Sequence, residues 1–140
     1  MKHVLIDTNI ILDIALQRKP FFMAAEQIFG EIDKGKIKGY VTASSVGDIY
    51  YVSKKSCGRE KAIAFIRELI DILEVLNVTK KNIIDALNSD FKDFEDAVQY
   101  CIANMNRIDI IVTRNKSDFE LAEIEICTPN ELMKKIKESR

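Results

Sequence analysis

The chain has 140 residues, 47% of them hydrophobic, which suffices for the core of one ordinary domain, so we expect a single domain over residues 1–140. Its 21 Lys and Arg residues are balanced by 22 Asp and Glu residues, which excludes an overall positive field that would attract nucleic acid or an anionic membrane. Three widely spaced cysteines and a short apolar N-terminal run argue against a disulfide framework, a zinc site, a signal peptide and a membrane span, and favour the cytoplasm.

Strand-like and helix-period segments alternate along the chain, which is the pattern of an α/β domain with a mostly parallel sheet. In chain order we expect a strand at residues 4–6, a short helix after residue 9, a helix around 25–32, a strand at 40–42, helices at 45–56 and 59–72, a strand at 74–76, helices at 81–87 and 94–105, a strand at 109–113, a helical turn from 118, a strand at 125–127 and a helix from 129 to about 137. The sequence therefore predicts five parallel strands with helices on both faces.

Some features of these elements are specific enough to be tested against a structure. Gly35 and Gly39 are expected to bracket the turn before the second strand, and the apolar run at 110–112 predicts a central strand covered on both faces. A capping box from Thr128 to Glu131 should open the last helix. One apolar face of the helix at 94–105 should comprise Phe94, Ala97, Val98, Cys101, Ile102 and Met105.

Acidic residues follow several of these strands, and the carboxyl ends of parallel strands are where ligands collect. Asp7 directly follows the first strand and is itself followed by Thr8 and Asn9. Asp48 lies early in the helix after the second strand. Each acid has an ordinary alternative role, because Asp7 can cap the next helix and Asp48 can be a solvated residue that favours the helix dipole.

A third group of acids stands at the entrance of the helix at 94–105. Asp93 is the best N-cap candidate, with Asp96 at the third helical position of a capping box. Glu95 can be an ordinary solvent-exposed residue. Asp96 nevertheless precedes Ala97, where the buried stripe begins. We therefore expect Asp96 to lie close to the body of the protein, where it can point into the crevice.

The loop after the fourth strand carries a hydroxyl, an amide and a carboxylate on Thr113, Asn115 and Asp118. Asp118 can equally cap the helical turn that follows. Arg114 and Lys116 flank these groups and are the best candidates for contacts with a nucleic-acid backbone, although ordinary solubility also explains them.

The argument for function is that all the acid-bearing segments fall on one edge of the predicted sheet. Two carboxylates 4 Å apart repel by about 4 kcal/mol at an effective dielectric constant of ~20, so such a cluster needs a cation. Its donors are oxygens, which favours Mg²⁺ or Mn²⁺ over zinc. His3 is the single histidine and lies at the opposite end of the first strand, which excludes histidine acid-base catalysis. The remaining reaction class is metal-assisted hydrolysis of a phosphodiester.

Taken in order, Asp7-Thr8-Asn9, the segment 93–97 and the segment 113–119 resemble the PIN-domain family, especially the small VapC-type toxins of toxin-antitoxin pairs. The resemblance spans essentially the whole chain. It implies a three-layer α/β/α PIN-like fold with a central five-stranded parallel sheet. It also implies a Mg²⁺-dependent or Mn²⁺-dependent endoribonuclease that forms a homodimer and is inhibited by a small antitoxin protein.

The resemblance also assigns site residues. The expected catalytic acids are Asp7, Asp48, Asp96 and Asp118. Of these, Asp7, Asp96 and Asp118 are the expected metal ligands. The expected supporting residues are Asn9, Glu95, Thr113 and Asn115. Many relatives have glutamate where this chain has Asp48, whose shorter side chain lets a bridging water replace direct coordination.

Several other functions compete with this one. A metal-dependent DNA nuclease uses the same chemistry and is the strongest rival. A PIN-like binding module without catalysis is disfavoured because all four acids are retained. A phosphorylated receiver domain would carry paired acids after its first strand and an Asp after its third, whereas this chain has only Asp7 and then Leu76-Asn77 there. A phosphatase of the haloacid-dehalogenase type would need an Asp where Asn9 stands.

Overall fold

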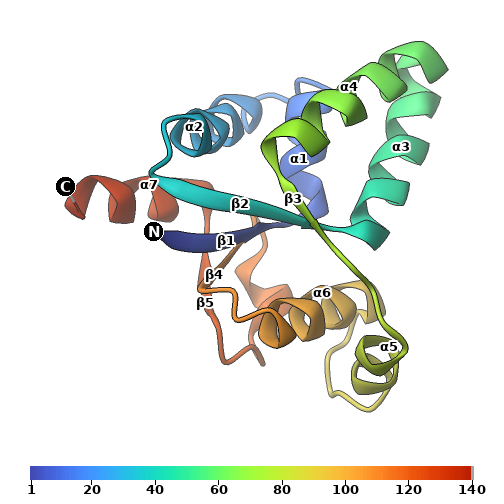
Figure 1. Cartoon of the computed structure of the whole chain (residues 1–140), viewed down its shortest axis with the longest axis vertical. Helices are drawn as coiled ribbons and strands as arrows, with labels where there is room; N and C mark the ends of the chain where they lie inside the picture. The colour runs from blue at the N-terminus through green and yellow to red at the C-terminus, as the bar shows by residue number, and fades with distance from the viewer. Residues whose placement is uncertain (140) are drawn as a thin grey trace.

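The computed structural model describes residues 1–139 and places five parallel strands in one sheet between two layers of helices (Figure 1). The strands are β1 (Lys2–Ile6), β2 (Ile37–Thr42), β3 (Glu74–Leu76), β4 (Ile110–Val112) and β5 (Glu125–Cys127). The helices are α1 (Thr8–Ala15), α2 (Phe22–Asp33), α3 (Ala43–Cys57), α4 (Arg59–Ile72), α5 (Lys80–Leu87), α6 (Phe94–Met105) and α7 (Pro129–Glu138), with a 3₁₀ turn η1 at Lys116–Phe119. The predicted three-layer α/β/α fold is confirmed. Arg140, the last residue of the predicted domain, lies outside the described residues.

The strand order β3-β2-β1-β4-β5 puts β1 at the centre of the sheet, where we had expected β4. The expectation that β4 is covered on both faces is confirmed, because it is an internal strand and all three of its residues are buried. From β1 the chain builds β2 and β3 on one side and β4 and β5 on the other, so the strand order reverses between β1 and β4. Such a switch point is where open parallel sheets bind their ligands. Ile6 is paired with Val112 across these strands, so Asp7 and Thr113 leave the sheet side by side.

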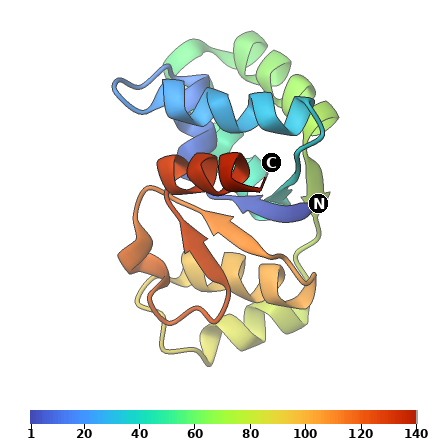
Figure 2. The same cartoon turned by 90° about the vertical axis from the view of Figure 1, so that its left-hand side faces the viewer.

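Alternate residues of each strand face the two helix layers, because successive side chains of a strand point to opposite faces. Val4 and Ile6 belong to the apolar core beneath α1, α2, α3, α4 and α7. Leu5 and Tyr40 belong to the second core, beneath α5, α6 and η1. Figure 2 shows α2 and α7 on one side of the sheet and α5 and α6 on the other. The sheet is therefore covered on both faces.

Gly39 does not lie in a turn as expected but inside β2, whereas Gly35 does lie in the preceding turn with φ +74°. A Cβ atom at Gly39 would lie 2.5 Å from Ile32 Cδ1 and 2.6 Å from Leu73 Cδ2. A side chain at position 39 would therefore have to displace the ends of the Ile32 and Leu73 side chains, which pack over the strand from α2 and from the end of α4.

The buried face of α6 also differs from the predicted stripe. Phe94 and Met105, the first and last residues of the helix, are about half exposed. Gln99 and Ala103, which the stripe omitted, are buried. Among residues 1–139, no helix combines the length and the hydropathy needed to cross a bilayer.

Candidate active site

Asp7 is buried at the switch point of the sheet. Asp7 is the N-cap residue of α1, as the alternative reading of the sequence expected, but its carboxylate makes no capping hydrogen bond to the helix. Instead, Thr113 Oγ1 donates to Oδ2 at 2.8 Å and Gln99 Nε2 donates to Oδ1 at 2.9 Å. Burial raises the pKa of Asp7, and these hydrogen bonds counteract part of the rise. Both carboxylate oxygens are therefore held in place, one by the loop after β4 and one by α6.

Asp93 and Asp96 have different roles at the entrance of α6. The Asp93 carboxylate accepts a hydrogen bond from the Asp96 N–H at 2.9 Å, so the predicted N-cap is confirmed. Unlike α5 and α7, α6 lacks the reciprocal bond of a capping box, which leaves the Asp96 carboxylate available. Burial raises the pKa of Asp96 to about 7, with further contributions from the charges of Asp93, Asp7 and Asp118.

The charges of acids from separate segments act on one another. Asp48 on α3 is the main cause of a raised pKa at Glu95 on α6. The charge of Asp118 on η1 raises the pKa of both Asp7 and Asp96. The structure thus brings together acids that follow β1, β2, β3 and β4, with Asp7 buried, Asp96 partly buried, and Asp48, Glu95 and Asp118 exposed.

The expected supporting residues divide into two groups. Thr113 is buried against Asp7 and also accepts a hydrogen bond from the Asn115 N–H at 3.2 Å, which shapes the loop. The Asn115 side chain accepts a bond from Ser117 Oγ at 3.2 Å and so stabilises the turn. Asn9 is exposed in the first turn of α1, and its supporting role stays a prediction.

The two basic residues expected to contact RNA are engaged with acids of this chain. Arg114 donates to the buried Asp13 carboxylate from Nε at 2.7 Å and from Nη2 at 3.1 Å, and its guanidinium lies 3.9 Å from the centre of the Phe21 ring. Lys116 pairs with Glu131 at 3.2 Å on the surface. Arg114 therefore ties the loop after β4 to α1, and the RNA contacts stay a prediction.

Sequence reasoning missed Gln99 and a group of hydroxyls beside Asp7. Gln99 lies three residues after Asp96 and so faces the same side of α6, and a polar residue next to Val98 in an apolar stripe was the available signal. Thr8 Oγ1 and Thr42 Oγ1 donate to the buried Ser45 Oγ at 2.7 Å and 2.9 Å. These bonds join the start of α1 to the start of α3.

The donors at this site are carboxylate, amide and hydroxyl oxygens, which suit Mg²⁺ or Mn²⁺. Within residues 1–139, no group of three or more His, Cys, Asp or Glu side chains is arranged so that it could hold a metal ion by itself. Mg²⁺ typically binds one or two carboxylates and completes its shell with water and substrate phosphate. The oxygen donors therefore fit such an ion, and the charge crowding that raises the pKa of Asp96 favours a cation there.

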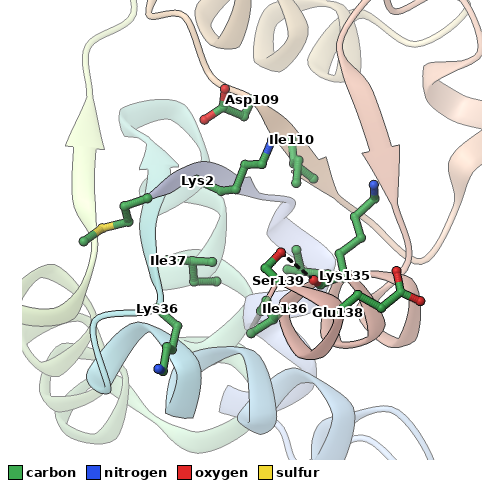
Figure 3. Close-up of a pocket in the computed structure, with 11 residues that line it drawn as sticks. Lys2, Lys36, Ile37, Asp109, Ile110, Lys135, Ile136, Glu138 and Ser139 are labelled. Atoms are coloured by element: carbon green, nitrogen blue, oxygen red, sulfur yellow. Dashed lines mark hydrogen bonds between the residues drawn. The ribbon is translucent and has the colours of Figure 1, made fainter.

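A cavity of about 820 Å³ opens at the opposite end of the sheet. Figure 3 shows that its charged groups do not converge, because Lys36 and Lys135 lie on opposite sides of the opening. Asp109 there accepts a hydrogen bond from the His3 N–H at 2.8 Å, which fixes the strand ends. This cavity lacks the clustered acids of the other edge.

Comparison with known proteins gives matches along most of the chain. A family model described as PIN domain matches residues 3–117. Ribonuclease VapC1 of Aquifex aeolicus (strain VF5) is 28% identical over 135 residues, which are 93% of this chain and 92% of the relative.

Two solved structures share the fold. A chain of a toxin-antitoxin complex from Klebsiella pneumoniae has a TM-score of 0.68 at 20% identity, over 90% of this chain and 97% of its own length. VapC20 of Mycobacterium tuberculosis, described as a Sarcin-Ricin loop cleaving toxin, has a TM-score of 0.64 at 15% identity, over 77% of this chain and 86% of its own. Both likenesses agree with the arrangement of strands and helices described above.

Proposed function

This chain belongs to the PIN domain family, and on this basis we propose that it is a cytoplasmic endoribonuclease, dependent on Mg²⁺ or Mn²⁺, and the toxin of a toxin-antitoxin pair. The observation that carries the proposal is the buried Asp7 carboxylate, fixed by Thr113 and Gln99 at the switch point among acids from three other segments. The name of the Aquifex aeolicus relative, a ribonuclease, supports RNA as the substrate.

In this proposal Asp7, Asp96 and Asp118 hold the ion together with water molecules that complete its shell, and Asp48 and Glu95 act beside it directly or through water. A bound ion of this kind lowers the pKa of a water molecule and stabilises charge on the phosphate. The chain itself supplies a rigid site, because Thr113 and Gln99 hold both oxygens of Asp7. A carboxylate fixed in advance needs no reorganisation when the substrate arrives.

The same proposal includes two protein partners. An antitoxin is supported by the toxin-antitoxin complex from Klebsiella pneumoniae, whose chain has this fold. A second copy of the chain, giving a homodimer, follows from the family resemblance. Size-exclusion chromatography with light scattering tests the homodimer, and co-purification with the product of a neighbouring short reading frame tests the antitoxin.

The decisive experiment measures cleavage of a single-stranded RNA and of a DNA of the same sequence, with Mg²⁺, with Mn²⁺ and with EDTA. We expect cleavage of the RNA with either ion, none with EDTA, and none by the Asp7→Asn or Asp96→Asn variants. Asp90→Asn, an exposed acid before α6, is the matched control and should retain activity. Preferential cleavage of the DNA would support the rival DNA nuclease, and full activity of Asp7→Asn would remove the basis of the proposal.

A further inference from the structure

A second cavity, of about 260 Å³, lies directly beside the acids of the candidate active site. It is bordered by the starts of α1 and α3, by α5 and by the first turns of α6, and it opens to solvent. Its apolar lining residues are Val78, Ile83, Phe94 and Val98. Its polar lining residues are Thr8, Ser44, Ser45, Asp48, Glu95 and Gln99. We call this space the side cavity.

Gln99 gives the side cavity an unusual feature. The residue is only 4% exposed, and its Nε2 is committed to Asp7 at 2.9 Å. Its Oε1 is buried and has no hydrogen-bond partner in the part of the chain that the structure describes. A buried carbonyl without a donor is rare in folded proteins and costs stability, so a donor from outside the chain would be favoured here.

The chemistry of the lining restricts what can enter. The acceptors that line the space include the carboxylates of Asp48 and Glu95, Gln99 with its unpaired Oε1 borders it, and the lining contains no Lys or Arg. Such a space repels a phosphate group. It suits a neutral group that offers hydrogen-bond donors and has apolar faces to pack against Phe94 and Val98, and a nucleobase with an exocyclic amino group has both properties.

We propose that the side cavity receives an amino-bearing base of the substrate strand and that Gln99 is a specificity-determining residue. The proposal rests on the proposed function, because it takes RNA as the ligand. Adenine, cytosine and guanine carry the exocyclic amino group, and uracil does not. The enzyme should therefore disfavour uridine at one position near the bond that it cleaves.

Binding of two labelled hexanucleotides, rC₆ and rU₆, tests the inference without cleavage when it is measured by fluorescence anisotropy in EDTA. Their phosphates are identical, so repulsion by the acids cancels in the ratio of the two dissociation constants. We expect the wild type to bind rC₆ about fivefold more tightly, which is the effect of roughly one hydrogen bond.

Two adjacent residues of α5 provide a matched pair of variants. Ile83 and Ile84 are 40% and 44% exposed, and only Ile83 lines the side cavity. Ile83→Trp should fill the cavity and bring the ratio close to one, whereas Ile84→Trp should leave it unchanged. Gln99→Leu should also abolish the preference. Because this variant loses the hydrogen bond to Asp7, it is judged by the ratio of the two dissociation constants and not by its activity. Thermal melting of each variant verifies the fold.

Each other outcome is informative. Equal binding of rC₆ and rU₆ by the wild type overturns the inference, as does a preference that survives in Ile83→Trp. Competition by N-acetylarginine amide without base preference would assign the cavity to a cationic side chain of a protein partner and overturn it as well. Cleavage of mixed-sequence RNA with Mg²⁺ is measured alongside. Cleavage without a base preference refutes only the proposed role of the side cavity. A base preference in binding without any cleavage refutes only the proposed nuclease activity.

Discussion

The Asp96 carboxyl group is placed where its charge destabilises the fold. It stands in the first turn of α6, where the helix dipole favours an anion, yet burial and neighbouring acids raise its pKa from 3.8 to about 7. A carboxyl whose pKa is higher in the folded than in the unfolded protein contributes most to stability below pH 4. That contribution is lost as the pH rises toward about 7.

Asp96→Asn should therefore stabilise the protein in EDTA at pH 8 and have little effect at pH 4, where Asp96 is protonated in the folded state. We expect the free energy of unfolding at pH 8 to rise by about 1 kcal/mol. This is less than the ~4 kcal/mol that corresponds to a pKa shift of about three units, because solvent screens a partly exposed group. Urea denaturation at the two pH values measures it. Asp90→Asn is the control, and an equal gain at both pH values would contradict the role assigned to charge crowding.

The Thr113 hydroxyl is predicted to stabilise the fold through Asp7. Thr113→Val keeps the shape of the side chain but leaves Asp7 Oδ2 buried without its donor at 2.8 Å, which should cost about 1–3 kcal/mol of unfolding free energy. Thr113→Ser retains a hydroxyl and should cost less. Both values follow from urea denaturation, and a Val variant as stable as the Ser variant would show that the bond contributes nothing.

At the scale of elements, one ion pair fastens the loop after β4 to α1. The Asp13 side chain is completely buried, Arg114 bonds to it with two nitrogens, and Arg18 lies 3.6 Å away. Removal of one partner leaves a buried charge uncompensated. The loop carries Thr113 and Asp118, so this pair also governs where those residues lie.

Arg114→Ala should lower the unfolding free energy by about 3 kcal/mol, because Asp13 then keeps only the more distant Arg18. The double variant Arg114→Ala, Asp13→Ala should lose less than the sum of the two single changes. Lys116→Ala, which removes a surface pair with Glu131, is the control and should cost less than about 1 kcal/mol. Additive losses would show that Arg114 and Asp13 act independently.

The elements that could be predicted from the sequence are those with local signals. The helix at 59–72 and the strands at 74–76 and 125–127 have the bounds expected, and the capping box of Thr128 and Glu131 is present. Local patterns also found the acids that follow the strands. They could not find the pairing of Asp13 with Arg114, 101 positions apart, or the close approach of Leu73 to Gly39, because both depend on segments distant in sequence.

At the scale of the whole molecule, the strand order explains why distant acids meet. Because β1 is central, the segments after β2 and β4 leave the sheet on either side of Asp7, and α6 crosses beneath them with Gln99 toward Asp7. The two apolar cores on either side of the sheet hold this arrangement against the repulsion of its acids. Stability of the molecule should therefore depend on the cation that the acids are proposed to bind.

Mg²⁺ or Mn²⁺ should raise the melting temperature of the wild type more than that of Asp118→Ala. A ligand that binds only the folded state at a hundred times its dissociation constant stabilises it by about 2.7 kcal/mol, which corresponds to several degrees for a domain of this size. Asp118 is exposed, so its removal should leave the metal-free melting temperature almost unchanged and take away much of this gain.

Glu123→Ala, an exposed acid outside the cluster, should respond to the ions like the wild type. Because the acids repel one another only while they are ionised, the difference between wild type and Asp118→Ala should also shrink below pH 4. Differential scanning fluorimetry measures all of these shifts, and equal gains in wild type and Asp118→Ala would place the ion elsewhere on the molecule.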